Sequence, residues 1–171
     1  TETATAEEVA REVGSSDIAY VQVEAVLAQC DLFLNEGAAL QEKTQKAQKS
    51  WAQKEQNLQA EAAQLQEKYQ KGLITTNDAQ AQQQSIEKRV ASYQSSAQKE
   101  AQALDEENYV FTNRAQDLLH RAVQEINGDK KYKLIINATA LIDADSTLNI
   151  TPAVLAKVNE LYAADKKAVK K

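Results

Sequence analysis

The chain has 171 residues, enough for one domain with a sizeable core or for a small core that carries a large extended part. Aromatic residues make up 5% of it and charged residues 26%, proportions that favour long solvated helices over a dense globule. The net charge of −5 argues against nucleic acid as a partner, and no apolar run approaches the ~20 residues of a membrane span. The printed sequence opens with no signal peptide, which is expected of an exported chain after cleavage as well as of a chain that is never exported.

The N-terminal residues, 1–17, are rich in Thr, Glu and Ala. We expect them to form a mobile arm, because a lone helix as short as the one that 6–13 could form is marginally stable. Residues 18–23 follow with the sequence Ile-Ala-Tyr-Val-Gln-Val, whose β-branched and aromatic side chains predict a strand. A helix is predicted to begin directly after this strand, at Glu24.

Residues 24–126 predict two long helices joined by one turn. The stretch contains no Pro and consists largely of Ala, Gln, Glu, Lys and Leu, which favour helices. Gly72 predicts the end of the first helix. Thr76 or Asn77 predicts the start of the second, and Asn77 and Gln80 have the spacing of a capping box. Each helix would hold about 45 residues and extend about 70 Å.

Apolar positions in the two helices can be paired across this turn, as an antiparallel coiled coil requires. Facing residues such as Leu65 and Ile86 have numbers that add up to roughly 150. In the first helix, Lys54 and Glu61 interrupt the seam. The seam of the second helix advances in steps of three and four, or their multiples, through Ile86, Val90, Tyr93, Ala97, Leu104, Phe111, Ala115, Leu118, Ala122 and Ile126. So narrow a seam predicts a hairpin that needs a separate base and flexes relative to it.

The residues after the second helix predict a small β-containing base. Residues 127–129, Asn-Gly-Asp, predict an αL-type helix cap, 132–137 a second strand and 141–144 a third. A last helix would open with Thr151 as N-cap and Pro152 in the first position. The apolar face of this helix would consist of Val154, Leu155, Val158, Leu161 and Tyr162.

Beyond this helix, 166–171 predict a basic, frayed tail outside the core. The core itself would be thin, because two or three strands and one short helix bury little surface. Its strand edges would stay open, and pairing between subunits would close them. The sequence therefore predicts an oligomer.

The sequence contains no arrangement of side chains that predicts catalysis or cofactor binding. His120 is the only His, and its apolar neighbours favour a surface or seam-edge position over a catalytic one. Cys30 lies among apolar residues, which favours a buried structural thiol over a reactive one. Two Asn-x-Thr triplets, at Asn137 and Asn149, match the glycosylation pattern, but a strand end and a turn explain both. We predict no enzyme, no metal and no cofactor.

The two ends of the chain resemble the Skp family of OmpH-like periplasmic chaperones. Residues 18–27, Ile-Ala-Tyr-Val-Gln-Val-Glu-Ala-Val-Leu, are similar to the family's opening strand-to-helix segment. Residues 132–137, 141–145 and 148–155 resemble its closing segment, in which a motif of the type YADPSLDIT leads into the final helix. Between them lies a Gln-, Lys- and Glu-rich helical hairpin, as in the family. The resemblance extends from residue 18 to about residue 161.

Residues and resemblance together predict an α+β fold: a long antiparallel coiled-coil hairpin, or tentacle, on a small β-sheet body with a short C-terminal helix. The body would comprise 18–35 and 119–165, and the hairpin 36–118 with its tip near 72–78. The resemblance implies a homotrimer whose central cavity holds unfolded outer-membrane proteins in the periplasm without using ATP. The residues expected in the trimer body are Ile18, Tyr20, Val21, Val23, Leu134, Ile135, Ile136, Leu141 and Ile142.

Charge separates this chain from the best-known members of the Skp family, which are strongly basic. The sequence pI is about 5.0. An acidic chain argues against the contact with lipopolysaccharide or a membrane surface that the family resemblance would otherwise imply. Asn149 stands where the family commonly has Asp, a mild change at a turn. Client capture is instead expected to depend on apolar and amide contacts.

The hairpin turn is the predicted place of client contact. Leu73 and Ile74 lie between the helices, where the partner helix cannot cover them, and Tyr69 precedes them by one helical turn. Three copies at the mouth of one cavity would make a multivalent contact. The alternative is that Leu73 and Ile74 only plug the turn.

Two other functions compete with that of a holdase chaperone. A structural coiled-coil spacer or scaffold would need only the hairpin and would favour a tighter seam in both helices. A prefoldin-like cytosolic chaperone would have a similar shape, built on β-hairpins at the base. A holdase should suppress aggregation of an unfolded β-barrel protein at stoichiometric amounts, whereas a scaffold should not.

Overall fold

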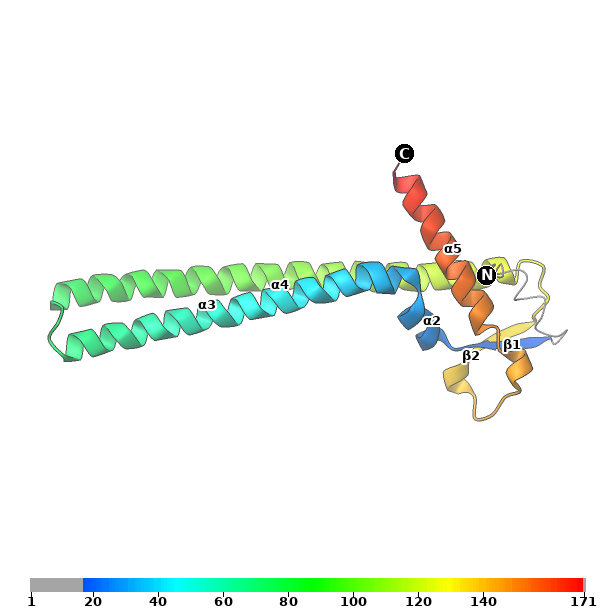
Figure 1. Ribbon diagram of the computed structural model, residues 1–171, viewed down its shortest axis with the longest axis horizontal. Helices are drawn as coiled ribbons and strands as arrows, with labels where there is room; N and C mark the ends of the chain where they lie inside the picture. Colours follow the sequence, from blue (N-terminus) through cyan, green and yellow to red (C-terminus); the bar gives the residue numbers. More distant parts are fainter. Residues whose placement is uncertain (1–16, 171) are drawn as a thin grey trace, which may run out of the picture. The chain divides into compact units, whose positions relative to one another are not determined.

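The computed structural model describes residues 17–170, so the predicted arm lies outside the described residues except for Asp17, and Lys171 of the predicted tail lies outside them too. The described chain divides into two compact units. We call residues 17–39 and 110–170 the body, and Leu40–Tyr109 the hairpin. Most of each unit is helical, and the strands lie in the body (Figure 1).

Two long helices lie side by side along the hairpin, α3 (Ala38–Gln70) and α4 (Thr76–Ile126) (Figure 1). Gly72 ends α3 with a φ of 68°, a left-handed conformation that favours Gly. The N–H of Gly72 donates to the carbonyl of Tyr69, and that of Leu73 to the carbonyl of Lys68, as in a Schellman motif. The predicted helix end is confirmed.

The start of α4 differs slightly from the prediction. The hydroxyl of Thr75 accepts a hydrogen bond from the N–H of Asp78 at 3.1 Å, so Thr75 caps the helix instead of Thr76 or Asn77. Asp78 also places a negative charge in the first turn, where the helix dipole favours it.

The predicted seam is confirmed by burial along both helices. Ala47, Leu65, Ile86 and Leu104 are buried within the hairpin. Three polar pairs join the helices, and in each the residue numbers again add up to about 150: Lys43 with Glu107, Trp51 with Glu100, and Glu61 with Arg89. Lys54 and Glu61 are exposed, as expected of the interruptions in the first helix.

The sheet of the body consists of two parallel strands, β1 (Ile18–Val21) and β2 (Leu134–Asn137). Their register pairs Ile18 with Leu134 and Val21 with Asn137. On the other side of β1, Tyr20 forms an isolated parallel bridge to Asn149, and its carbonyl accepts the N–H of Ile150 at 3.0 Å. Segments from both ends of the chain therefore meet in one sheet, as the sequence predicted.

The predicted third strand, 141–144, is wrong. The segment has no strand pairing in the described structure; it connects two short 3-10 helices, η2 (Ala138–Ala140) and η3 (Ser146–Leu148). The side chain of Asn137 accepts the N–H of Thr139, and that of Asp145 accepts the N–H of Thr147. These side-chain caps turn the backbone away from an extended path, and Asn149 occupies the edge of β1 that a third strand could have used.

The first helix is not continuous from Glu24, as the sequence predicted. Helix α2 (Val23–Gln29) ends at Cys30, whose backbone is extended; the chain becomes helical again at Asp31 and continues through the π-helical segment η1 (Phe33–Gly37). The N–H of Asp31, where the helix resumes, donates to the side chain of Asn159 at 2.8 Å. This long-range cap stabilises a break that local helix propensity does not reveal.

Helix α5 (Thr151–Val169) completes the body, and Pro152 lies in its first turn, one position later than predicted. The predicted N-cap is wrong: Ile150 precedes the helix, and the hydroxyl of Thr151 accepts the N–H of Gln22 at 2.9 Å. The cap predicted at 127–129 is also wrong in detail, since the positive φ falls at Lys130. The buried core of the body consists of Ala19, Val21, Val26, Cys30, Leu32, Leu118, Ala122, Tyr132, Ile150, Val154, Val158, Leu161 and Tyr162.

Candidate functional site

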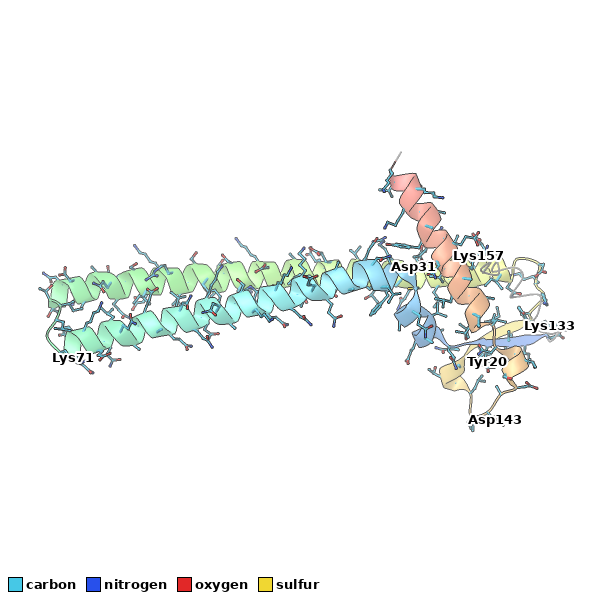
Figure 2. The ribbon with its side chains drawn as sticks, in the orientation of Figure 1. Tyr20, Asp31, Lys71, Lys133, Asp143 and Lys157 are labelled. Atoms are coloured by element: carbon cyan, nitrogen blue, oxygen red, sulfur yellow. The ribbon has the colours of Figure 1, made fainter. Side chains whose placement is uncertain are left out.

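The turn of the hairpin presents an apolar surface. Leu73 is 68% exposed and Tyr69 is 49% exposed, whereas Ile74 is partly buried. Figure 2 labels Lys71 in the same turn. The left-handed backbone at Gly72 directs the chain out of α3 just before Leu73, and this geometry leaves Leu73 uncovered by either helix. The structure thus places the three predicted client-binding residues at one end of the hairpin.

Next to the turn, the two faces of the hairpin carry grooves of different chemistry. We call one the amide groove; it is lined by Ala62, Ala63, Leu65, Gln66, Tyr69, Thr76, Ala79, Gln80, Gln83, Gln84 and Glu87. We call the other the ion-pair groove; it is lined by Glu61, Gln64, Leu65, Lys68, Gln82, Ser85, Ile86 and Arg89. Leu65 contributes to both because it lies in the seam. Neither groove was predicted from the sequence, although the run of Gln at 82–84 indicates an amide-rich surface.

The sheet of the body has one face in the core and one outside it. Ala19 and Val21 are buried, and Ile135 packs against the core, so Val21 and Ile135 both face inward. The opposite face carries Ile18 and Leu134, which are 45% and 51% exposed. The predicted trimer-body residues are therefore distributed over several environments: Val21 is buried, Tyr20, Val23, Ile135, Ile136 and Leu141 are partly buried, and Ile18, Leu134 and Ile142 are exposed.

An apolar hollow of the body lies between the sheet and α4. It is lined by Val21, Val23, Gln116, Leu119, His120, Val123, Ile135, Ile136 and Asn137. His120 is exposed at the rim of this hollow, consistent with the predicted surface position, and its Nε2 lies 3.1 Å from the Nε2 of Gln124. Leu119 and Val123 were not among the predicted site residues, although their spacing of four residues beside the seam predicts a second apolar stripe on α4.

A polar network fastens α5 to the rest of the body. Arg114 donates two hydrogen bonds to Glu36, at 2.5 and 3.5 Å, and the hydroxyl of Tyr162 donates to the same carboxylate at 3.1 Å. Arg121 forms a similar two-bond pair with Asp165. Partial burial acts to raise the pKa of Glu36, but the hydrogen bonds from Arg114 and Tyr162 outweigh it, and the pKa lies below its ordinary value of 4.5.

The residues that the sequence offered for chemistry have structural roles. Cys30 is buried, and its thiol donates to the carbonyl of Leu27 at 3.3 Å. Asn137 and Asn149 accept backbone N–H groups two residues further along, at the strand end and turn that the sequence predicted. Within residues 17–170, no three His, Cys, Asp or Glu side chains are grouped as a metal site would require. None of the described helices combines the length and apolar character needed to cross a bilayer.

The two units define an α+β protein that combines a coiled-coil hairpin with a small parallel sheet. A family model described as "Outer membrane protein (OmpH-like)" matches residues 17–158. The chain belongs to this OmpH-like family, which confirms the resemblance seen in the sequence.

A solved structure shares this fold. It is a crystal structure from Caulobacter crescentus CB15, provisionally assigned as an outer membrane chaperone (OmpH-like). The match has a TM-score of 0.72 at 16% identity and covers 86% of each chain. A search of curated proteins found no match.

Proposed function

We propose that the protein is an ATP-independent holdase chaperone, which binds unfolded outer-membrane proteins and prevents their aggregation. The observation that carries the proposal is the placement of apolar side chains in a member of the OmpH-like family. Within the hairpin, the large apolar residues that stay exposed are Tyr69 and Leu73 at the turn and Tyr109 at the far end. A mostly polar hairpin with an apolar turn can hold an unfolded chain weakly and release it without an energy source.

Three copies of the chain would form the working unit. Leu134 on the outer face of the sheet is half exposed, and β2 has a strand partner on one side only in the described structure. Contact between copies would bury this face and pair the open edge. Three hairpins around one cavity would then offer Leu73 and Tyr69 in triplicate, so that weak contacts add up to useful avidity.

The compartment that fits this role is the periplasm, where outer-membrane proteins pass in unfolded form. Periplasmic residence is supported by membership in the OmpH-like family. Binding to lipopolysaccharide or to membrane surfaces is not expected, because the chain carries a net charge of −5 and would be repelled by anionic headgroups.

An aggregation assay tests the proposed function. An unfolded β-barrel protein is diluted from denaturant, and light scattering is followed with and without the chain. We expect scattering to be suppressed as the chain reaches stoichiometric amounts, with no dependence on ATP. Undiminished scattering at a severalfold excess would reject the holdase and favour a structural spacer.

A further inference from the structure

We propose that the amide groove beside the hairpin turn is a binding site for extended, uncharged polypeptide segments, held through their backbone amide groups. The inference rests on the proposed function, because it names the part of a client that this surface would hold. It differs from the contact at Leu73 in place and in chemistry, since the groove runs along the side of the hairpin and is lined by glutamine amides as well as by apolar side chains.

The groove is formed by one stripe from each helix. Ala62, Gln66 and Tyr69 are spaced by four and three residues along α3, so they lie on one helix face. Gln80 and Gln84 form the corresponding stripe on α4, again four residues apart. Ala62, Ala63 and Ala79 also line the groove, and Tyr69 lies at the end nearest the turn.

The amides in this groove are available for a ligand. Among the side-chain hydrogen bonds of residues 17–170, Gln83 donates to Glu87 at 3.1 Å, whereas Gln66, Gln80 and Gln84 take part in none. Each glutamine amide offers both a carbonyl acceptor and an NH₂ donor. A peptide backbone presents the same two groups in alternation, so a row of amides can satisfy an extended chain whatever its side chains are.

The charges of the two grooves separate them further. The ion-pair groove contains Glu61, Lys68 and Arg89, and Arg89 is engaged by Glu61 through both of its terminal nitrogens. The amide groove contains one charged residue, Glu87, which accepts the amide of Gln83. With no cation among its lining residues, the amide groove has nothing to attract a phosphate or a carboxylate. Its chemistry fits an uncharged backbone.

This chemistry suits barrel proteins before they fold. Their strands alternate apolar and polar side chains that differ from segment to segment, so the backbone is the feature that all segments share. The hydrogen bonds would replace bonds to water and would each contribute little, which keeps the contact reversible. Tyr69 and the alanines that line the groove would add apolar contact for every second side chain.

Two matched double variants test the groove. Gln66→Glu with Gln80→Glu removes two amide donors from the amide groove. Gln64→Glu with Gln82→Glu makes the same chemical change, with the same added charge, in the ion-pair groove. Gln and Glu have similar helix propensity, so both variants should keep the parent's circular dichroism spectrum and mass. A third variant, Gln66→Ala with Gln80→Ala, removes the amides without adding charge.

The readout is the affinity for a fluorescently labelled unfolded barrel protein, measured by anisotropy. We expect binding about fivefold to tenfold weaker for both variants of the amide groove, and within about twofold of the parent for the ion-pair groove. A photoreactive residue at position 83 should also cross-link to the client more strongly than one at position 85.

The outcomes separate the two claims. Equal affinity for all three variants and the parent, with equal cross-linking at both positions, overturns the amide groove and leaves the holdase intact. A parent chain that does not bind the client at all overturns both.

Discussion

Ile18 and Leu134 are register partners in the parallel pair of β1 and β2, and both point away from the core of the body. Leu134 is 51% exposed, on a strand whose next residue, Ile135, packs inside. The inner face of this strand pair thus belongs to the core of the body, and its outer face is the surface that the proposed assembly would bury.

The first prediction distinguishes these two faces. Val21→Asp should unfold the body, because it places a carboxylate at a position that is 2% exposed, at a cost of about 3 kcal/mol or more. Leu134→Asp should leave the circular dichroism spectrum unchanged and reduce the mass in analytical ultracentrifugation from trimer to monomer. A parent chain that sediments as a stable, folded monomer would refute the proposed assembly.

The second prediction concerns motion within the hairpin. Only four seam residues of Leu40–Tyr109 are buried, and Glu61 replaces an apolar residue with an exposed ion pair to Arg89. We expect hydrogen exchange to be fastest at 68–81 and slowest in β1 and β2, because local opening follows local burial. Uniform protection along both helices would instead indicate a rigid spacer.

The third prediction tests the apolar turn. Leu73→Ser together with Ile74→Ser should weaken binding of an unfolded barrel protein about threefold or more while helix content and mass stay constant. Most of the effect should come from Leu73, since Ile74 is partly buried. Val169→Ser, at an exposed aliphatic residue of α5, serves as the control. Equal affinities for parent, control and double variant would mean that the turn is structural.

The fourth prediction follows from the lowered pKa of Glu36. A carboxylate with a lower pKa in the folded state stabilises the fold above its unfolded pKa of about 4.5, and this contribution is lost as the pH falls through the folded value. Its side chain is 34% exposed, so solvent screening limits the contribution to about 0.5 kcal/mol. Urea unfolding should show Glu36→Gln less stable than the parent by this amount at neutral pH. The difference should disappear well below pH 4; a constant difference at all pH values would contradict the assignment.

Periodicity and the two ends of the chain were enough to predict most of this fold. Every seam residue predicted on α4, from Ile86 to Ile126, is buried or partly buried, because a repeat over many turns outweighs local exceptions. The break at Cys30 could not be predicted in the same way. The break is capped by the side chain of Asn159, which accepts the N–H of Asp31. These two residues are 128 positions apart in the sequence and meet only in the folded body.

The candidate site was predicted in part, for a similar reason. Leu73 and Tyr69 could be placed at the turn because Gly72 locates the turn in the sequence. The amide groove could not, since its composition appears only when stripes of α3 and α4 are brought together in the right register. The false third strand at 141–144 shows the converse case, in which β propensity is overruled by side-chain caps at both ends.

The mass of the chaperone–client complex tests the central claim most directly. A labelled unfolded barrel protein is mixed with an excess of the chain and analysed by native mass spectrometry. The account predicts one client bound to three copies of the chain, with free trimer as the other species. A client that stays unbound, or that binds to single copies of the chain, would contradict it.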